Sequence, residues 1–429
     1  MFPVFSPCSY RVPMGGAFCP ADSVNPDAQS LWRAPQWAFA ILLAVLGMLG
    51  PFSIDTYLPG FAAMGASLQA TPLQMQQTLS AYLLAFAFMA LFHGAISDSF
   101  GRRPVVLWGM AVFTLASAGC ALSETIAQLV FFRALQGLAT GAGIVIARAV
   151  IRDMYEPAQA QKVMSQVTLF FGIAPAIAPL IGGWLLVWIG WQAIFWFLTA
   201  VGVALWLANF RWLPETLHIS QRQRFHPRNL LAGYWQLGGD RRFVLLALSS
   251  GVPFNGMFLY VLSAPVFLSE QLHLLPQQFF VFFMFTISGI MAGAWVSGRV
   301  AGRRTPKRQI RDGFLVMLCV GVLNVAANLV FIPNVWWAML PVCIFAFGWA
   351  LMVPAVTILV LDLHPERRGM ASSLQMFVGT SANAIVAGLV SPLVMHSPVA
   401  LAVASLGLMS VGLVSWMYLH HRWPEIGQA

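Results

Sequence analysis

The sequence predicts an all-α membrane protein with twelve transmembrane helices in two pseudo-symmetric six-helix bundles. Three observations support this prediction. The 429 residues are 59% apolar and only 9% charged, whereas soluble domains carry about 25% charged residues. Apolar stretches recur along most of the chain, and each is longer than the roughly 18 residues needed to cross a bilayer. Basic residues gather in alternate connections between these stretches, which is typical of a multi-span membrane protein.

Glycine, proline and charged residues mark the ends of the expected spans. The spans are expected at 36–58, 78–97, 104–122, 126–149, 163–188, 191–212, 243–268, 277–298, 312–332, 335–361, 370–393 and 398–420. The longest polar stretch of the body separates the sixth span from the seventh. The expected parts are a tail at 1–34, a bundle at 35–213, a linker at 214–242, a bundle at 243–421 and a tail at 422–429.

The distribution of arginine predicts which side of the membrane each connection faces. Arg102 and Arg103 follow span two, the linker follows span six, and Arg367 and Arg368 follow span ten. The connections at the other end of the spans contain no lysine or arginine. Because basic connections remain in the cytoplasm, both termini are expected there, with the protein in the inner membrane.

The remaining composition argues against several other classes of protein. The net charge of +9 comes from short clusters between apolar stretches, so a nucleic-acid partner is not expected. The five cysteines show no paired spacing, so neither a disulfide nor a metal site is expected. Residues 1–34 lack a signal-peptide pattern. We expect a disordered cytoplasmic tail there, or alternatively a start site placed too early, with Met14 as one candidate.

Two charged residues lie inside predicted spans at a similar depth. Asp55 in span one and Arg133 in span four are each roughly 8–10 Å below the outer boundary. Such residues are costly, at about 2.5–3.5 kcal/mol on insertion scales, and are usually functional. Asp55 could pair with Arg133 when ionised and release it when protonated, as a proton switch; a static ion pair is the alternative. Arg148, nearer the cytoplasm, is interpreted as an anchor at the helix end outside the cavity.

The short connection after span two is interpreted as a conformational latch. Asp98 could cap the amino end of span eleven near Gly369 and hold the halves closed on the cytoplasmic side; a tight turn with solvated charges is the alternative. Gly101-Arg102-Arg103 recurs as Gly302-Arg303-Arg304 between spans eight and nine, which suggests duplication. The expected latch residues are Gly94, Asp98, Gly101, Arg102 and Arg103.

Span five is expected to be bent and closely packed. Its prolines remove helical hydrogen bonds and its glycines let another helix approach; these residues are Gly172, Pro175, Pro179, Gly182 and Gly183. Polar or aromatic residues elsewhere could line a substrate cavity, although each could instead serve only in packing. The candidates are Tyr82, Phe86, Asn255, Tyr260, Gln375 and Asn383.

Together these motifs resemble those of the major facilitator superfamily, and specifically of twelve-span drug:proton antiporters of the bicyclomycin-resistance (Bcr/CflA) subfamily. The connection at 94–103 is similar to the signature loop of the superfamily, and Arg133-Ala134-Leu135-Gln136-Gly137 to its fourth-helix motif. The segment 178–183 is similar to its antiporter motif, and 54–59 to the subfamily pattern. Two positions depart from these patterns, Ser99 in place of arginine and Ala178 in place of glycine.

The resemblance implies a proton-coupled secondary active transporter that exports hydrophobic drugs or antibiotics by alternating access. It also implies a monomer without a cofactor, with proton-coupling roles for Asp55 and Arg133. The alternative is a proton-coupled transporter of one metabolite, such as an amino acid or peptide. A membrane enzyme or channel fits less well, because no catalytic cluster or charged ring is recognisable. Neither Lys162 nor Lys307 follows a glycine, so an ATP-binding P-loop is not expected.

Overall fold

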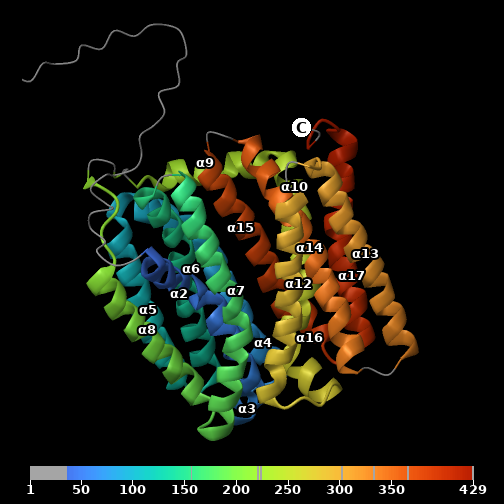
Figure 1. Cartoon of the computed structure of the whole chain (residues 1–429). Helices are drawn as coiled ribbons and strands as arrows, with labels where there is room; N and C mark the ends of the chain where they lie inside the picture. The colour runs from blue at the N-terminus through green and yellow to red at the C-terminus, as the bar shows by residue number, and fades with distance from the viewer. Residues whose placement is uncertain are drawn as a thin grey trace, which may run out of the picture.

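The computed structural model describes residues 36–155, 157–219, 222, 225–300, 303–331, 334–364 and 367–427. No side chain is described for residue 36 or for most of residues 157–173. The expected tail at 1–34 and Gly302 of the second tripeptide therefore lie outside the described residues. Every regular element in the described part of the chain is helical, as Figure 1 shows.

The described elements fall into two groups of long helices, separated by one shorter helix. The first group contains α2 (Gln36–Asp55), η1 (Leu58–Gly60), α3 (Phe61–Ser67), α4 (Pro72–Phe100), α5 (Arg102–Ala121), α6 (Ile126–Met154), α7 (Pro157–Trp188) and α8 (Gln192–Trp212). The shorter helix is α9 (Pro227–Gly239). The second group contains α10 (Arg241–Leu262), α11 (Ala264–Val266), η3 (Phe267–Gln271), η4 (Pro276–Gln278), α12 (Phe279–Val300), α13 (Pro306–Val330), α14 (Val335–Leu363), α15 (Arg368–Ile385), η6 (Val386–Val390), α16 (Ser391–Val394) and α17 (Pro398–Arg422).

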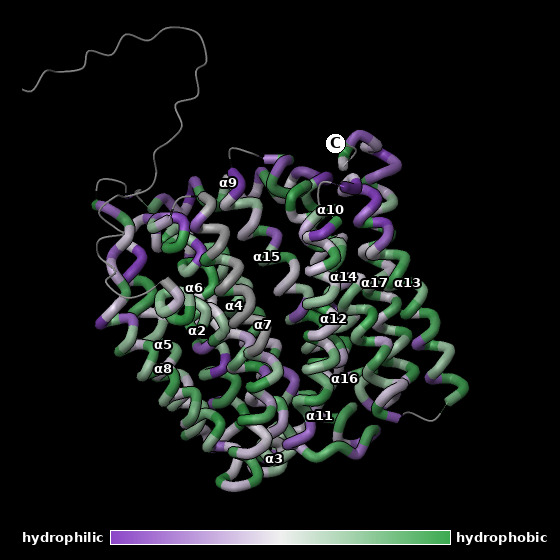
Figure 2. Tube along the Cα trace, in the orientation of Figure 1, coloured by the Kyte–Doolittle hydropathy of each residue, from purple (hydrophilic) through white to green (hydrophobic). Residues whose placement is uncertain are grey.

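The long helices have the length and composition of membrane spans. Among the described residues, eleven helices are long and apolar enough to cross a membrane. The twelfth long helix is α7, with 32 residues, which contains the predicted span 163–188. Figure 2 shows apolar residues over the middle of the bundle and hydrophilic residues towards its ends, above all at the end where α9 lies. The predicted all-helical, multi-pass membrane fold is confirmed.

Polar residues cap the starts of several helices, and at α4 the cap extends the helix beyond the apolar stretch that predicted it. The Thr71 side chain and the Gln74 side chain form a capping box at the start of α4. Thr125 and Gln128 do the same at the start of α6. A capping box satisfies amide groups that the first helical turn leaves free. As a result α4 begins at Pro72, several residues before the apolar span expected at 78–97.

The two halves of the molecule touch at one end of the bundle. We call this the closed end, and the end that holds Arg102, Arg367 and α9 the arginine-rich end. At the closed end Gln76 Nε2 donates to the Leu262 carbonyl at 2.9 Å. Ser80 Oγ donates to the Ala384 carbonyl at 3.0 Å, just before the π-helical turn η6. These bonds join α4 of the first half to the second half.

At the arginine-rich end the connection between the halves is a helix that lies across the bundle. Figure 1 shows α9 running across this end. Tyr234 Oη of α9 donates to the Leu91 carbonyl of α4 at 2.8 Å. Arg367, just before α15, donates from Nη1 to Gln236 Oε1 of α9 at 2.7 Å. The predicted linker 214–242 thus contains a helix that contacts both halves.

Candidate functional site

A buried arginine lies at the centre of the first half. Arg133 on α6 is 0% exposed. Its guanidinium carbon lies 4.6 Å from the ring centre of Tyr57 and 4.4 Å from that of Tyr82. Nη1 donates to the Ser53 carbonyl at 3.3 Å and to Gln136 Oε1 at 2.8 Å. A cation over an aromatic face gains about 2 kcal/mol or more when water is excluded, so the two rings stabilise a charge that lipid would not.

The neighbouring motif residues fix the position of this arginine. Gln136 Nε2 donates to Ser117 Oγ at 2.7 Å, which links α6 to α5 through one amide. A Cβ atom at Gly137 would collide with the backbone carbonyl of Tyr82. Glycine therefore lets α6 pack closely against α4, and this packing brings the Tyr82 ring over Arg133.

The second predicted charge, Asp55, is buried and pairs with none of the described residues. It is the last residue of α2, and its exposed fraction is only 5%. Within the described residues its carboxylate makes neither a hydrogen bond nor an ion pair. Arg133 Nε and Nη2 also have no hydrogen-bond partner there. The predicted pair between Asp55 and Arg133 is therefore not formed in this conformation.

Helix geometry explains why the two charges do not meet. The Ser53 hydroxyl points towards Tyr82, whose ring packs on Arg133, since Ser53 Oγ donates to Tyr82 Oη at 3.0 Å. Residues turn by about 100° each along an α-helix, so the Asp55 side chain is rotated by about 200° from that of Ser53. Pairing of Asp55 with Arg133 would require the end of α2 to rotate or unwind.

The predicted antiporter motif packs directly beside Asp55. A Cβ atom at Gly182 would collide with the carbonyl of Thr56, the residue after Asp55. A Cβ atom at Gly183 would lie 2.6 Å from the Pro276 carbonyl of the second half. These glycines bring α7 against both halves at the closed end, and Pro175 and Pro179 lie within the same helix. The surroundings of Gly172 lie outside the described residues.

The predicted latch is bound within the first half. Arg102 is 7% exposed; its Nη1 lies 2.5 Å from Asp98 Oδ1 and its Nε lies 3.0 Å from Asp153 Oδ2. Gly101 makes the turn possible, since its φ of +100° is a conformation that glycine readily adopts. In the part of the chain that is described, Asp98 makes no hydrogen bond to α15. The predicted cap on span eleven is thus not formed in this conformation.

Sequence reasoning missed one carboxylate of this network. Glu215 follows α8, and its Oε1 accepts from the Arg102 amide at 2.9 Å while its Oε2 accepts from the Arg103 amide at 3.3 Å. Arg103 Nη2 donates to the Phe210 carbonyl at 2.5 Å. Glu215 thereby holds the first turn of α5, where amide groups lack helical partners. The signal that was available is an acidic residue at the start of a linker rich in arginine.

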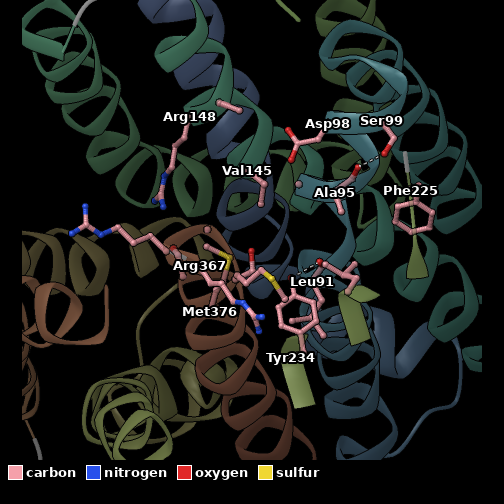
Figure 3. A pocket seen from close by; sticks show the side chains of 18 of the residues that line it. Leu91, Ala95, Asp98, Ser99, Val145, Arg148, Phe225, Tyr234, Arg367 and Met376 are labelled. Carbon is pink, nitrogen blue, oxygen red and sulfur yellow. Dashed lines mark hydrogen bonds between the residues drawn. The ribbon is translucent and has the colours of Figure 1, made fainter. Parts of the chain in front are cut away.

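A large cavity separates the halves at the arginine-rich end. Its volume is about 1020 Å³, and its walls come from α4 and α6 on one side and from α9 and α15 on the other. Figure 3 shows Arg148 and Asp98 of the first half on one side, and Arg367 and Met376 of the second half on the other. Gly94, Asp98 and Arg102 of the predicted latch line this cavity. The closed end and this cavity together define a conformation open on one side.

Arg148 corrects one interpretation made from the sequence. It was expected to anchor the helix end outside the cavity, but it lines the cavity wall. The direction of the side chain depends on how α6 is rotated against α15, and no sequence pattern gave that rotation.

The residues expected to line a substrate cavity lie elsewhere in this conformation. Tyr82 packs on Arg133, and a Cβ at Gly141 would lie 3.5 Å from Phe86. In the second half, Asn324 Nδ2 donates to Tyr260 Oη at 2.8 Å, and Gln375 Nε2 donates to Ser250 Oγ at 3.0 Å. None of the six predicted residues lines the large cavity; they are Tyr82, Phe86, Asn255, Tyr260, Gln375 and Asn383.

Groups suited to metal binding do not gather in the described part of the chain. No cluster of three or more histidine, cysteine, aspartate or glutamate residues occurs among the described residues. Cys120, Cys319 and Cys343 are free thiols. The candidate site therefore consists of Asp55, Arg133 and the charged cavity at the arginine-rich end.

Comparisons with known proteins agree with this architecture. The chain is 29% identical to Multidrug resistance protein D of Escherichia coli over 90% of its own length and 97% of that protein. It is 27% identical to the Bicyclomycin resistance protein homolog of Haemophilus influenzae over 90% of the chain and 96% of that protein. A crystal structure of a bacterial homologue of the human lysosomal transporter Spinster, in an inward-facing and unoccupied conformation, shares the fold with a TM-score of 0.70 and 14% identity, covering 92% of this chain and 99% of that one.

The match to a family model decides the classification. The sequence model of the Major Facilitator Superfamily matches residues 43–387, which is most of the chain and includes both halves of the bundle. The relatives named for multidrug and bicyclomycin resistance fit the Bcr/CflA subfamily. The chain belongs to the Major Facilitator Superfamily.

Proposed function

We propose that the protein exports hydrophobic drugs or antibiotics from the cytoplasm across the inner membrane in exchange for protons. The observation that carries the proposal is the cavity of about 1020 Å³ between two halves that are joined at the opposite end. A site open to one side only is what alternating access requires. The resistance proteins named above support drugs as the cargo, and no observation favours a single metabolite.

The orientation in the membrane follows from the arginines. In this proposal the arginine-rich end faces the cytoplasm, because basic connections remain on that side. The cavity then receives its substrate from the cytoplasm or the inner leaflet. Both termini are on the same side, and the chain works as a monomer, since one chain supplies both halves of the cavity.

Asp55 and Arg133 together form the proton switch. A carboxylate that is 5% exposed and pairs with none of the described residues is tolerated in a membrane only as the neutral acid or beside a cation. A proton taken from outside keeps Asp55 neutral in the conformation described here. Loss of that proton creates a charge that Arg133 attracts, and Arg133 has two nitrogens free to receive it. Because the pair requires α2 to rotate, deprotonation changes the preferred shape of the first half.

The test measures drug efflux from cells that lack their own pumps. The panel contains fluorescent cations and neutral antibiotics, with and without a protonophore. Cells that produce the wild-type protein should expel several compounds. The protonophore should abolish the drug concentration gradient that these cells maintain. Asp55→Asn removes the titratable group. This variant should no longer export drug against the drug concentration gradient, but it should still exchange drug down that gradient.

The matched control is Glu124→Gln, in the short connection before α6, where the residue is exposed and lies outside the cavity lining. This change removes a carboxylate that water already solvates, so efflux should stay within about twofold of wild type. Transport that ignores the protonophore would refute proton coupling. An Asp55→Asn variant coupled as well as wild type would remove Asp55 from the switch.

A further inference from the structure

The cavity at the arginine-rich end carries more positive charge than its carboxylates neutralise. Its lining includes five arginines and a single aspartate: Arg102, Arg148, Arg152, Arg367, Arg368 and Asp98. Arg102 is neutralised by Asp98 and Asp153, and Arg368 lies 3.4 Å from Asp362. Among the described residues, the Arg367 side chain donates only to the neutral amide of Gln236. In the described part of the chain, Arg148 and Arg152 have neither an ion pair nor a hydrogen bond.

The depth of Arg148 distinguishes it from a topology signal. It precedes Met154, the last residue of α6, by six positions, so it lies about 9 Å inside the helix end. Topology needs a basic residue only near the end of a span. An unpaired guanidinium this far inside is costly unless it faces water or an anion. Arg148 is exposed and lines the cavity, so it faces the space where a ligand would lie.

The second half presents a further positive surface to the cavity. Arg367 stands immediately before α15, and the first residues of that helix, Arg368 to Met370, line the cavity. The amino end of α15 has no side-chain cap, so its free amide groups and helix dipole favour a negative group. Figure 3 shows Arg148 and Arg367 on opposite sides of the cavity. An anion between them would contact both halves.

The other walls of the cavity suit an apolar body. Leu91 and Val145 come from the first half, and Leu361, Met370 and Met376 come from the second. Methionine side chains adapt to ligands of different shapes. An apolar group on this wall would leave a polar head within reach of the guanidinium groups. Guanidinium forms paired hydrogen bonds with carboxylate, sulfonate and phosphate oxygens.

We propose that this cavity selects amphiphiles that carry an acidic group, a carboxylate, sulfonate or phosphate, which Arg148 and Arg367 hold while the apolar body lies on the leucine and methionine wall. The proposal refines the proposed function by naming the chemical class of its substrate. Contact of one acidic group with both halves also gives the substrate a direct means of drawing the arginine-rich end together, which alternating access requires after loading.

Three probes that differ in a single group test the proposal. They are 1-pyrenebutyrate, 1-pyrenebutanol and 1-pyrenebutylamine, which share a ring and chain but carry a carboxylate, a hydroxyl and an ammonium. Binding to purified full-length protein in phosphatidylcholine nanodiscs is measured by energy transfer from its tryptophans, of which there are 16. Empty nanodiscs correct for uptake by the lipid. The acid should bind at least about tenfold tighter than the amine, as charged hydrogen bonds predict.

Single substitutions identify the groups responsible. Arg148→Gln and Arg367→Gln should each weaken binding of the acid by about tenfold and leave binding of the alcohol within about twofold, which also shows that the variants fold. Arg308→Gln removes a guanidinium at the start of α13 that does not line the cavity. It should leave all three affinities unchanged.

The possible outcomes separate this proposal from the proposed function. Equal affinity of the wild-type protein for the acid and the alcohol would overturn acid selection. An equal loss of affinity for all three probes in Arg148→Gln would do the same. A protein that binds the acid selectively yet moves no drug under a proton gradient would retain acid selection and lose the proposed function. Replacing half of the lipid with phosphatidylglycerol identifies the source of the acidic group that the cavity binds. Weaker binding of the acid probe indicates that the cavity also binds a lipid headgroup. Unchanged binding indicates a soluble amphiphile.

Discussion

The two halves of the molecule have similar helices but differ in what they bury. The first half buries the charged residues Asp55, Arg102 and Arg133. In the described part of α10 to α17, every buried polar residue is uncharged, and contacts such as the 2.8 Å bond from Asn324 to Tyr260 connect the helices. Neutral hydrogen bonds do not respond to a proton at physiological pH, whereas buried charges do.

The connections at the arginine-rich end show the same difference. In the first half, the buried Arg102 joins Asp98 and Asp153 in a partly buried network. In the second half, Arg304 and Arg311 both contact Asp312, and both arginine side chains are more than half exposed. The described residues of the second connection therefore lack the buried charge of the first. We infer that the first half responds to the proton and the second half moves against it.

The largest effect is expected from removing the buried cation of the first half. Arg133→Met loses two cation–π contacts, each worth about 2 kcal/mol where water is excluded, and also the bond to Gln136. Proton-driven efflux should fall by at least about a hundredfold if these contacts differ between conformations. Arg133→Lys keeps the charge and should recover part of the activity. Efflux by Arg133→Met within twofold of wild type would contradict a central role for this cation.

A smaller effect is expected at the connections. Asp98→Ala removes one of the two carboxylates that bind Arg102, a carboxylate that lines the same cavity as the amino end of α15. Turnover should slow by about tenfold, in the range of measured conformational couplings, with substrate affinity retained. The equivalent change in the second half, Asp312→Ala, breaks only exposed pairs and should change turnover by less than about twofold. Loss of substrate binding in Asp98→Ala would count against the latch, as would equal slowing by both variants.

Breaking the neutral network should affect stability more than coupling. Tyr260→Phe removes the hydroxyl that accepts from Asn324, and hydrogen bonds between membrane helices contribute about 0.6–1.7 kcal/mol. The melting temperature in detergent should fall by a few degrees, while efflux keeps its sensitivity to a protonophore. A variant that transports without dependence on the proton gradient would show that the second half takes part in coupling.

The sequence predicts the fold well because lipid imposes one strong rule on the chain. Apolar length and arginine placement identified the long helices, and the family motifs placed Asp55 and Arg133 in the first half. Helix ends were less accurate, because caps such as Thr71 and Gln74 extend α4 into polar sequence. The helix in the linker was missed because α9 is short and carries both polar and apolar residues.

The site was predicted less completely because it depends on rotation and conformation. Asp55 and Arg133 share a depth, yet the 200° or so between Ser53 and Asp55 on α2 separates them in this state. Arg148 faces the cavity through the rotation of α6, which periodicity alone does not give when most of a span is apolar. Asp98 and Gly369 line one cavity without touching, and only coordinates reveal which stage of the transport cycle is present.

The smallest effect on stability is expected from a carboxylate of the second half that lies outside the membrane spans. Asp240 precedes α10 and accepts from the Arg242 amide at 2.9 Å and from its Nη2 at 3.0 Å. Burial raises the pKa of the Asp240 carboxyl, but hydrogen bonds and charge from Arg242 outweigh burial and leave that pKa below its ordinary value. A lowered pKa in the folded state means that the carboxylate stabilises the fold above about pH 3.9 and loses this contribution as the pH falls further.

Asp240→Asn should therefore lower the melting temperature in detergent by a small amount, since a helix cap contributes about 1 kcal/mol. The difference from wild type should persist from about pH 8 to about pH 5 and shrink below about pH 4. Asp362→Asn, with its exposed carboxylate, should show little difference at any pH. If the difference in melting temperature between wild type and Asp240→Asn disappeared between about pH 8 and about pH 6, titration of Asp240 would not be its cause. Efflux should be unchanged in Asp240→Asn, because this charge lies outside the helices that bury the proton switch.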